Sequence, residues 1–180
     1  QAELNQQRLD GAGLQGVYYC DTSENMDAYV DDATVDFVFS CPPYADLEVY
    51  SEDPRDLSNM SHAEFFELYS HILGKTYAKL KPNRFACIVT SEVRAKGGEY
   101  IGLVPGTIDA MEAAGYQYYN EIVLVTPCGT LPQRAGKAMH SGRKVGRTHQ
   151  NVLIFYKGDI KQIGKTMGNV AVPMGEEDAE

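Results

Sequence analysis

The 180-residue sequence predicts a doubly wound α/β fold, in which a mostly parallel sheet carries an antiparallel hairpin at one edge. Apolar runs rich in β-favouring residues alternate along the chain with segments of helical period. The last two of these runs are separated by a long loop, which is typical of a hairpin with a large insertion. We expect one domain over residues 1–160 and a peripheral or disordered tail over residues 161–180.

The N-terminal region predicts a helix, a short strand and a second helix. Residues 2–9 are expected to be helical, because Gly11 follows them as a typical stop. The apolar run over residues 17–20 predicts a strand that ends at Asp21, and residues 24–30 predict the next helix. The Asp21 carboxylate can accept a hydrogen bond from a ribose or an adenine amino group, or it can cap the following helix; both interpretations stay open.

The central strand covers residues 35–39, and a rigid turn follows it. The turn comprises Ser40, Cys41, Pro42, Pro43 and Tyr44. Proline has no N–H for a ladder and fixes φ, so we expect a buried strand that ends abruptly. Ligands of open α/β sheets bind outside the carboxyl ends of the strands, which makes this turn a candidate reaction site. A polyproline-type ligand for a partner domain and a plain structural turn are the alternatives.

A loop, a helix and a strand are expected next. The polar, acidic loop over residues 45–60 is too long for a minimal turn, so we expect it to lie over the site. Ser61 and Glu64 have the spacing of a capping box, and the apolar positions after them predict a helix over residues 62–81. Residues 84–90 predict a second buried strand.

The C-terminal elements complete the alternation of strands and helices. A polar, Gly-rich connection over residues 91–100 leads to a helix over residues 105–114, with proline in its first turn and Gly115 after its end. Residues 118–126 and 151–156 predict the two strands of the hairpin.

Charge is distributed unevenly along the chain. The net charge of −9 argues against nucleic-acid binding, but residues 127–158 contain no Asp or Glu and carry six basic residues, which leaves −15 on the rest. A basic loop on an acidic body is a focused patch that suits phosphate; a solvated surface loop is the alternative. The candidate phosphate contacts are Arg134, Lys137, Arg143, Lys144 and Arg147.

Composition argues against several classes of protein. No apolar run approaches the about 20 residues that span a bilayer, and the polar N-terminus differs from a signal peptide, so no membrane partner is expected. The cysteines are far apart and form no Cys-x-x-Cys pair, which argues against a zinc site or a disulfide framework and predicts a reducing cytoplasm.

The strand followed by Cys-Pro-Pro-Tyr resembles motif IV of the S-adenosylmethionine-dependent amino-methyltransferases of DNA. From about Val17 to Gly158, including SCPPYADLEVYSEDPRDLSNMS and SGRKVGRTHQNVLIFYKG, the chain is similar to phage-type DNA modification methylases. The resemblance implies a Rossmann-like methyltransferase fold, S-adenosylmethionine as cofactor and double-stranded DNA as partner. It also implies the cytoplasm of a bacterial or phage-infected host cell.

The resemblance assigns roles to single residues. Asp21 would be the acidic residue of motif III beside the cofactor's adenine, and Ser40 would be a second cofactor contact. The catalytic residues would be Ser40, Cys41, Pro42, Pro43 and Tyr44. The turn would hold the exocyclic amine of a flipped base in place while Tyr44 stacks on its ring.

Two departures from the family pattern limit this resemblance. The residue before Pro42 is Cys41, where the family has Asp, Asn or Ser, and a thiol is a weak hydrogen-bond acceptor. The glycine-rich motif I is missing, and Gly11-Ala12-Gly13 is a weak substitute because it follows a helix. We therefore expect residues 1–160 to be a partial methyltransferase domain that lacks its first strands. The strand over residues 35–39 would then have an unpaired apolar edge. We therefore expect that the chain is a fragment, that it self-associates, or that a partner supplies the missing strands.

Three functional interpretations stay open. The first is part of a DNA methyltransferase acting on N6 of adenine or N4 of cytosine. The second is a non-catalytic nucleic-acid-binding or partner subunit. The third is a methyltransferase acting on RNA or a small molecule. No metal is expected in any of them.

Overall fold

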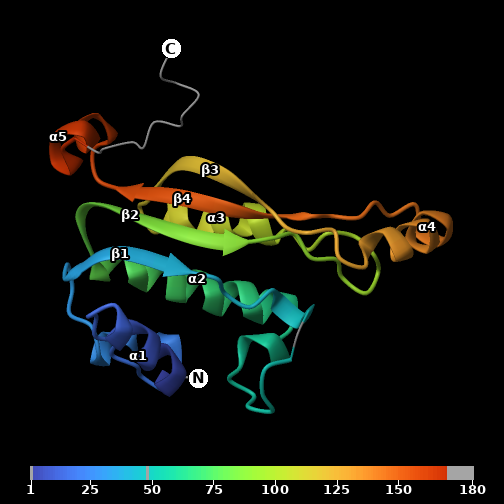
Figure 1. Cartoon of the computed structure of the whole chain (residues 1–180), viewed down its shortest axis with the longest axis horizontal. Coiled ribbons are helices and arrows are strands. Elements are labelled where there is room, and N and C mark those ends of the chain that lie inside the picture. Colours follow the sequence, from blue (N-terminus) through green and yellow to red (C-terminus); the bar gives the residue numbers. More distant parts are fainter. Residues whose placement is uncertain (1, 48, 170–180) are drawn as a thin grey trace.

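The computed structural model describes residues 2–47 and 49–169 (Figure 1). Its four-stranded sheet consists of β1 (Val35–Ser40), β2 (Leu80–Thr90), β3 (Gln117–Val125) and β4 (His149–Lys157). The α-helices are α1 (Ala2–Gly11), α2 (His62–Lys79), α3 (Leu103–Ala113), α4 (Leu131–Gly142) and α5 (Ile163–Met167). Short 3₁₀ helices cover Ser23–Ala28 (η1), Ala45–Leu47, Leu57–Asn59 and Ile160–Gln162.

The strand order of the sheet is β1-β2-β4-β3. β1 is parallel to β2, whereas β4 is antiparallel to both β2 and β3. In the described sheet, β1, β2 and β3 therefore run one way and β4 runs the other. The predicted α/β fold with an antiparallel hairpin is confirmed, and β4 lies inside the sheet while β3 forms its edge.

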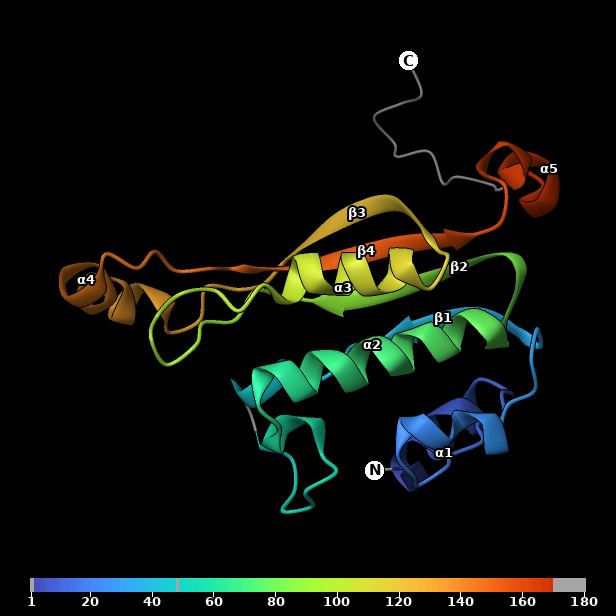
Figure 2. The ribbon, with the colours of Figure 1, turned by 180° about the vertical axis from the view of Figure 1, so that it is seen from behind.

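Helices α2 and α3 lie side by side on one face of the sheet (Figure 1, Figure 2). The predicted capping box starts α2, because the Ser61 side chain accepts the Glu64 N–H and the Glu64 carboxylate accepts the Ser61 N–H. Apolar side chains from both helices and from β2 and β4 form one core. Its buried members include Phe65, Tyr69, Leu80, Ile88, Leu103, Met111, Leu153 and Phe155.

No loop separates α2 from β2. The helix ends at Lys79 and the strand begins at Leu80, so the predicted boundaries at residues 81 and 84 were too late. Pro82 is accommodated in the strand because the pairing with β1 shifts register in this region.

β1 is an edge strand among the described residues, and one of its faces is open. Phe37 and Phe39 are 54% and 63% exposed, so the prediction of a buried strand over residues 35–39 is wrong for this structure. The reason is that α2 and α3 cover only one face of the sheet and β2 pairs with only one side of β1. The unpaired apolar edge predicted for this strand is present.

Two N-terminal predictions differ from the structure. Residues 17–20 have no ladder partner in the described part of the chain, and Val17 is 74% exposed. The predicted strand is wrong because apolar composition does not supply the neighbouring backbone that a strand needs. The predicted helix over residues 24–30 is the short 3₁₀ helix η1, with Thr22 as its N-cap.

The loop between β3 and β4 contains helix α4, which the sequence did not predict. Pro132 lies in the first turn of α4, and Arg143 ends it in the left-handed region at φ 53°. Gly136 in the helix interior weakens the local helical signal. Figure 1 shows α4 at the end of an arm that extends from the sheet, with α5 at the opposite end of the molecule.

The predicted tail over residues 161–180 is described only in part. It forms α5, and residues 170–180 lie outside the described residues. In the described chain, no helix combines the length and the apolar character needed to cross a bilayer.

Candidate active site

The sheet topology brings three chain segments to one edge. β1 and β2 are parallel, so their carboxyl ends meet there, and the turn over residues 41–44 leaves β1 at that edge. β4 runs the opposite way, so its amino end, His149 and Gln150, reaches the same edge. Two cavities border this turn.

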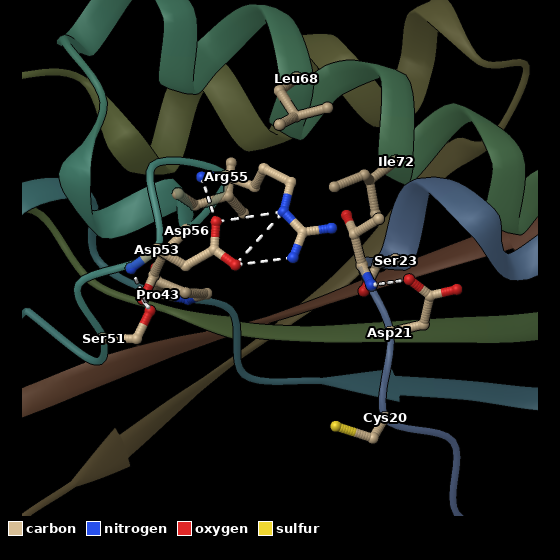
Figure 3. Close-up of a pocket in the computed structure, with 12 residues that line it drawn as sticks. Cys20, Asp21, Ser23, Pro43, Ser51, Asp53, Arg55, Asp56, Leu68 and Ile72 are labelled. Carbon is tan, nitrogen blue, oxygen red and sulfur yellow. Dashed lines mark hydrogen bonds and ion pairs between the residues drawn. The ribbon is translucent and has the colours of Figure 1, made fainter.

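The first cavity has a volume of about 440 Å³ (Figure 3). Leu68 and Ile72 of α2 form an apolar wall, and Asp21, Pro43 and Arg55 come to it from three other segments. Small-molecule sites typically have volumes of about 300–1,000 Å³ and mostly apolar walls with a few polar groups. The cavity has the size and the lining of such a site.

The Asp21 carboxylate in this cavity is held by its neighbours. Oδ1 accepts the Thr22 backbone N–H at 2.8 Å, and Oδ2 accepts the Tyr29 hydroxyl at 2.8 Å. The Asn25 amide lies 3.0 Å from both oxygens. The bonds from Tyr29, Asn25 and Thr22, in this order, lower the pKa of Asp21, so the group stays ionised. The N-cap of η1 is Thr22, whose hydroxyl accepts the Glu24 N–H at 3.4 Å.

Arg55 and Asp53 form an ion pair at the mouth of the same cavity. The Arg55 Nη2 lies 2.7 Å from Oδ2 of Asp53, and Nε lies 3.1 Å from Oδ1. Hydrogen bonding to Arg55 lowers the pKa of Asp53 to about 2. The two side chains are 69% and 41% exposed, so the pair contributes little to stability, and its exchange for a charged ligand would cost little.

The second cavity has a volume of about 180 Å³. Its lining residues are Cys41, Pro42, Tyr44, Leu47, Tyr50 and Gln150. Pro42 therefore lines the second cavity while the adjacent Pro43 lines the first. Proline fixes φ, so the Pro42-Pro43 turn is rigid and holds the two cavities at a fixed position relative to each other.

Tyr44 connects the second cavity to the core and to β4. Its ring is half-buried against the core, and its Oη accepts a hydrogen bond from Gln150 Nε2 at 2.6 Å. The Cys41 sulfur lies 3.7 Å from the same oxygen. Burial, followed by the contact with Cys41, raises the pKa of Tyr44, so its hydroxyl stays protonated.

Ser40 differs from the other residues of the predicted turn. It lies in β1 opposite Ile88, and it lines neither cavity. Its assignment as a cofactor and catalytic contact stays a prediction.

The predicted phosphate contacts lie on α4 and on the segment between α4 and β4, where the Lys144 side chain lies beside Gly98. Arg134 and Lys137 lie on α4, at the end of the arm (Figure 1). Arg143 is engaged by its own helix, because its Nη1 donates to the Met139 and His140 carbonyls at 3.0 Å each. Arg134, Lys137 and Arg143 therefore belong to the arm that carries α4 rather than to the turn over residues 41–44.

Arg147 lies closer to the sheet, in a cluster with Tyr100. Its Nη1 donates to Ser91 Oγ at 3.0 Å, and its guanidinium lies 5.7 Å from the Tyr100 ring centroid. The Arg94 guanidinium lies 4.0 Å from the same centroid. Sequence reasoning missed Arg94 and Tyr100, because only the return of the chain before β4 brings Arg147 to them.

Gln150 was also missed. It occupies the second position of β4 and lines the second cavity. The only signal in the sequence was its place within the segment THQNVLIFY, since nothing local indicates a contact with Tyr44.

No family model and no curated protein matches the chain. Solved structures do match its fold. One is a cytosine-N4-specific PvuII DNA methyltransferase, with a TM-score of 0.59 and 17% identity, covering 88% of this chain and 57% of that one. Another is a DNA modification methylase from Thermus thermophilus, complexed with S-adenosyl-L-methionine, with a TM-score of 0.55 and 16% identity, covering 86% and 56%.

A third similar structure is a sarcosine dimethylglycine methyltransferase from Galdieria sulphuraria, with a TM-score of 0.51 and 14% identity, covering 87% of this chain and 66% of that one. The chain spans little more than half the length of the two DNA methylases. The architecture is thus the Rossmann-like methyltransferase fold, as the sequence predicts.

Proposed function

We propose that this chain is part of an S-adenosylmethionine-dependent methyltransferase that modifies the exocyclic amine of a DNA base, N6 of adenine or N4 of cytosine. The observation that carries the proposal is the Pro42-Pro43 turn at the sheet edge. It borders both a cavity with a fixed carboxylate and a small cavity with a fixed tyrosine. The fold shared with DNA methylases supports the proposal.

The first cavity fits the adenosine part of S-adenosylmethionine. Leu68 and Ile72 offer an apolar surface to a purine. The ionised Asp21 would accept from an amino group or a ribose hydroxyl in exchange for one of the hydrogen bonds that hold it. The residues that the structure describes include no Gly-x-Gly turn directly after a strand, which is the turn of motif I. The fit between this cavity and the cofactor therefore concerns only the adenosine part. When bound, the cofactor supplies an electrophilic methyl group.

The second cavity would receive the target base. Extruding a base from a duplex costs a few kcal/mol, and stacking on the Tyr44 ring would offset part of that cost. The rigid turn would hold the exocyclic amine at the boundary between the two cavities. Positioning is therefore the main contribution of these residues to the rate. Double-stranded DNA would be held by the basic residues of the arm and by Arg147.

A non-catalytic nucleic-acid-binding subunit is the second candidate. Cys41 favours it, because a thiol accepts hydrogen bonds weakly at the position before Pro42. A methyltransferase for RNA or a small amine would use the same two cavities.

Calorimetric titration of the purified chain with S-adenosylmethionine tests the proposal. We expect saturable micromolar binding, weakened about tenfold or more by Asp21→Asn, because a hydrogen bond to a charged acceptor is lost. Asp31→Asn, at an exposed acid outside the cavity, is the matched control and should bind like wild type.

Absence of binding by the wild-type chain would contradict the cofactor assignment for these residues. Cofactor binding without methyl transfer to DNA would favour RNA or a small molecule as substrate. DNA binding without cofactor binding would favour the non-catalytic subunit.

A further inference from the structure

We propose that Gln150, rather than Cys41, supplies the side-chain hydrogen-bond acceptor for the target amine. The inference rests on the proposed function and concerns the cavity of about 180 Å³ that Gln150 lines with Cys41 and Tyr44. It identifies the residue that distinguishes a base with an exocyclic amine from one with a carbonyl at the same position.

The strand order explains how Gln150 reaches this cavity. β4 lies next to β2, and its ladder with β2 extends only to the pair of Thr90 and Asn151. Gln150 comes one residue before Asn151, so it lies beyond the end of the ladder between β2 and β4. The turn that follows β1 can contact it there. The contact joins Tyr44 to a residue 106 positions away in the sequence.

The hydrogen bond to Tyr44 orients the Gln150 amide. Nε2 donates to Tyr44 Oη at 2.6 Å, which directs Oε1 away from that hydroxyl because the amide group is planar. Within the described chain, no donor is bonded to Oε1. The amide oxygen is therefore a fixed acceptor on a residue that lines the cavity.

Cys41 is the weaker candidate for two reasons. A thiol sulfur is a poor acceptor compared with an amide oxygen. In addition, Tyr44 Oη accepts from Gln150, so its own proton is available to the Cys41 sulfur 3.7 Å away.

This arrangement predicts a preference for amino over keto bases. The amine at C4 of cytosine or C6 of adenine can donate to Oε1, whereas the carbonyl of uracil or hypoxanthine would place two acceptors against each other. The preference arises from contacts to the base. It is separate from the phosphate contacts, which are the same for all sequences.

Binding of matched single-stranded oligonucleotides to the full chain tests the inference. Oligodeoxycytidylate and oligodeoxyuridylate of equal length differ in an amine or a carbonyl at C4 and in the lone pair or N–H at the adjacent N3. Oligodeoxyadenylate and oligodeoxyinosinate differ in the same way at C6 and N1. We expect wild type to bind the amino member of at least one pair several-fold to about tenfold more tightly. Gln150→Met, which keeps the length of the side chain, should bring this ratio close to one, because it removes both the hydrogen bond to the amino member and the repulsion from the keto member.

Two further variants and one spectroscopic readout accompany the measurement. Gln150→Glu keeps an acceptor and should keep the preference, and Gln162→Met is the same substitution on a surface far from the cavity (Figure 1). In ¹⁵N–¹H spectra, the side-chain amide signals that Gln150→Met removes should shift with the amino oligonucleotide and not with the keto one.

A preference for the amino base that survives in Gln150→Met would overturn the inference, whether or not Cys41→Ala loses that preference. A wild-type ratio of one for both pairs would overturn it as well. Failure of the proposed function gives a different result, since the chain would then not bind S-adenosylmethionine in the calorimetric titration, whatever its preference among the four oligonucleotides.

Discussion

At the scale of single residues, Tyr44 combines two roles that the sequence presented as alternatives. Its ring packs on the core, as expected for a structural turn, and it also lines the second cavity, as expected for a reaction site. Gln150 and Cys41 both contact its hydroxyl. Removing the ring of Tyr44 and removing only its hydroxyl should therefore have separable effects.

Two substitutions of Tyr44 separate these effects. Tyr44→Ala should abolish methyl transfer while DNA binding and its salt dependence remain, because phosphate contacts do not involve the ring. Tyr44→Phe keeps the ring and should lower the stability of the fold by about 0.5–1.5 kcal/mol, the value of one hydrogen bond. Transfer of labelled methyl groups and fluorescence anisotropy at two salt concentrations measure the effect of Tyr44→Ala, and denaturant unfolding measures the effect of Tyr44→Phe. Loss of DNA binding in Tyr44→Ala would show that the residue is structural.

Asp27 carries a pH-dependent part of the stability. Its carboxylate pairs with Lys75 and Lys79 of α2, both at 2.6 Å, and these bonds lower its pKa to about 2 from 3.8. The contribution is therefore present above about pH 4 and is lost as the pH falls through about 2.

Asp27→Asn should consequently lower the midpoint of denaturant unfolding at pH 7, and the difference from wild type should shrink as the pH falls and vanish only below about pH 2. Asp31→Asn is the matched control, since Asp31 is exposed and lies in the same connection. An equal loss at both pH values would mean that the ion pairs to α2 do not account for the effect.

At the scale of elements, the long connection between β3 and β4 carries the basic residues on α4 and on the segment that follows it, where the Lys144 side chain lies beside Gly98. Arg134, Lys137 and Arg143 belong to the α4 arm, whereas Arg147 contacts Ser91 and lies beside Tyr100 at the sheet edge.

Replacing Arg143, Lys144 and Arg147 together by Gln should weaken DNA binding and flatten its salt dependence. The logarithmic slope should fall by about 0.9 for each duplex phosphate that the variant no longer neutralises. Titrations at several salt concentrations measure this slope. Lys161→Gln with Lys165→Gln, at the opposite end of the molecule, is the control and should leave the slope unchanged (Figure 1). An unchanged slope in the triple variant would remove these residues from the DNA site.

At the scale of the whole molecule, the open edge of β1 is the feature that most affects behaviour in solution. An unpaired strand presents free N–H and C=O groups, and here it also exposes Phe37 and Phe39. The chain also spans little more than half of the DNA methylases that it resembles in fold. We propose that this edge pairs with additional strands, supplied by a longer chain of which these residues are a fragment, by a second copy or by a partner.

The mass of the purified chain should therefore rise with concentration in analytical ultracentrifugation or small-angle scattering. Phe39→Lys should suppress this rise, because a charge on an edge strand opposes pairing. Val17→Lys, at an exposed apolar residue outside the four strands, should not. A compact, stable monomer at every concentration would contradict the proposal.

The sequence by itself determined the order and the type of most elements. The capping box of α2, the run that forms β1 and the prolines that end it are local signals, and each directs the backbone of its own segment. Local signals failed at residues 17–20, where no neighbouring strand is present among the described residues, and at α4, where glycine and proline obscured the helix.

Only the tertiary structure decided which side chains meet. The pairing of Tyr44 with Gln150, the position of Asp21 in the cavity that Pro43 borders, and the contact of Arg147 with Ser91 each join distant segments. These contacts depend on the strand order and on the reversed direction of β4, which arise from packing of the whole sheet. No periodicity or spacing along the chain encodes them, because a local pattern specifies a conformation and not a neighbour.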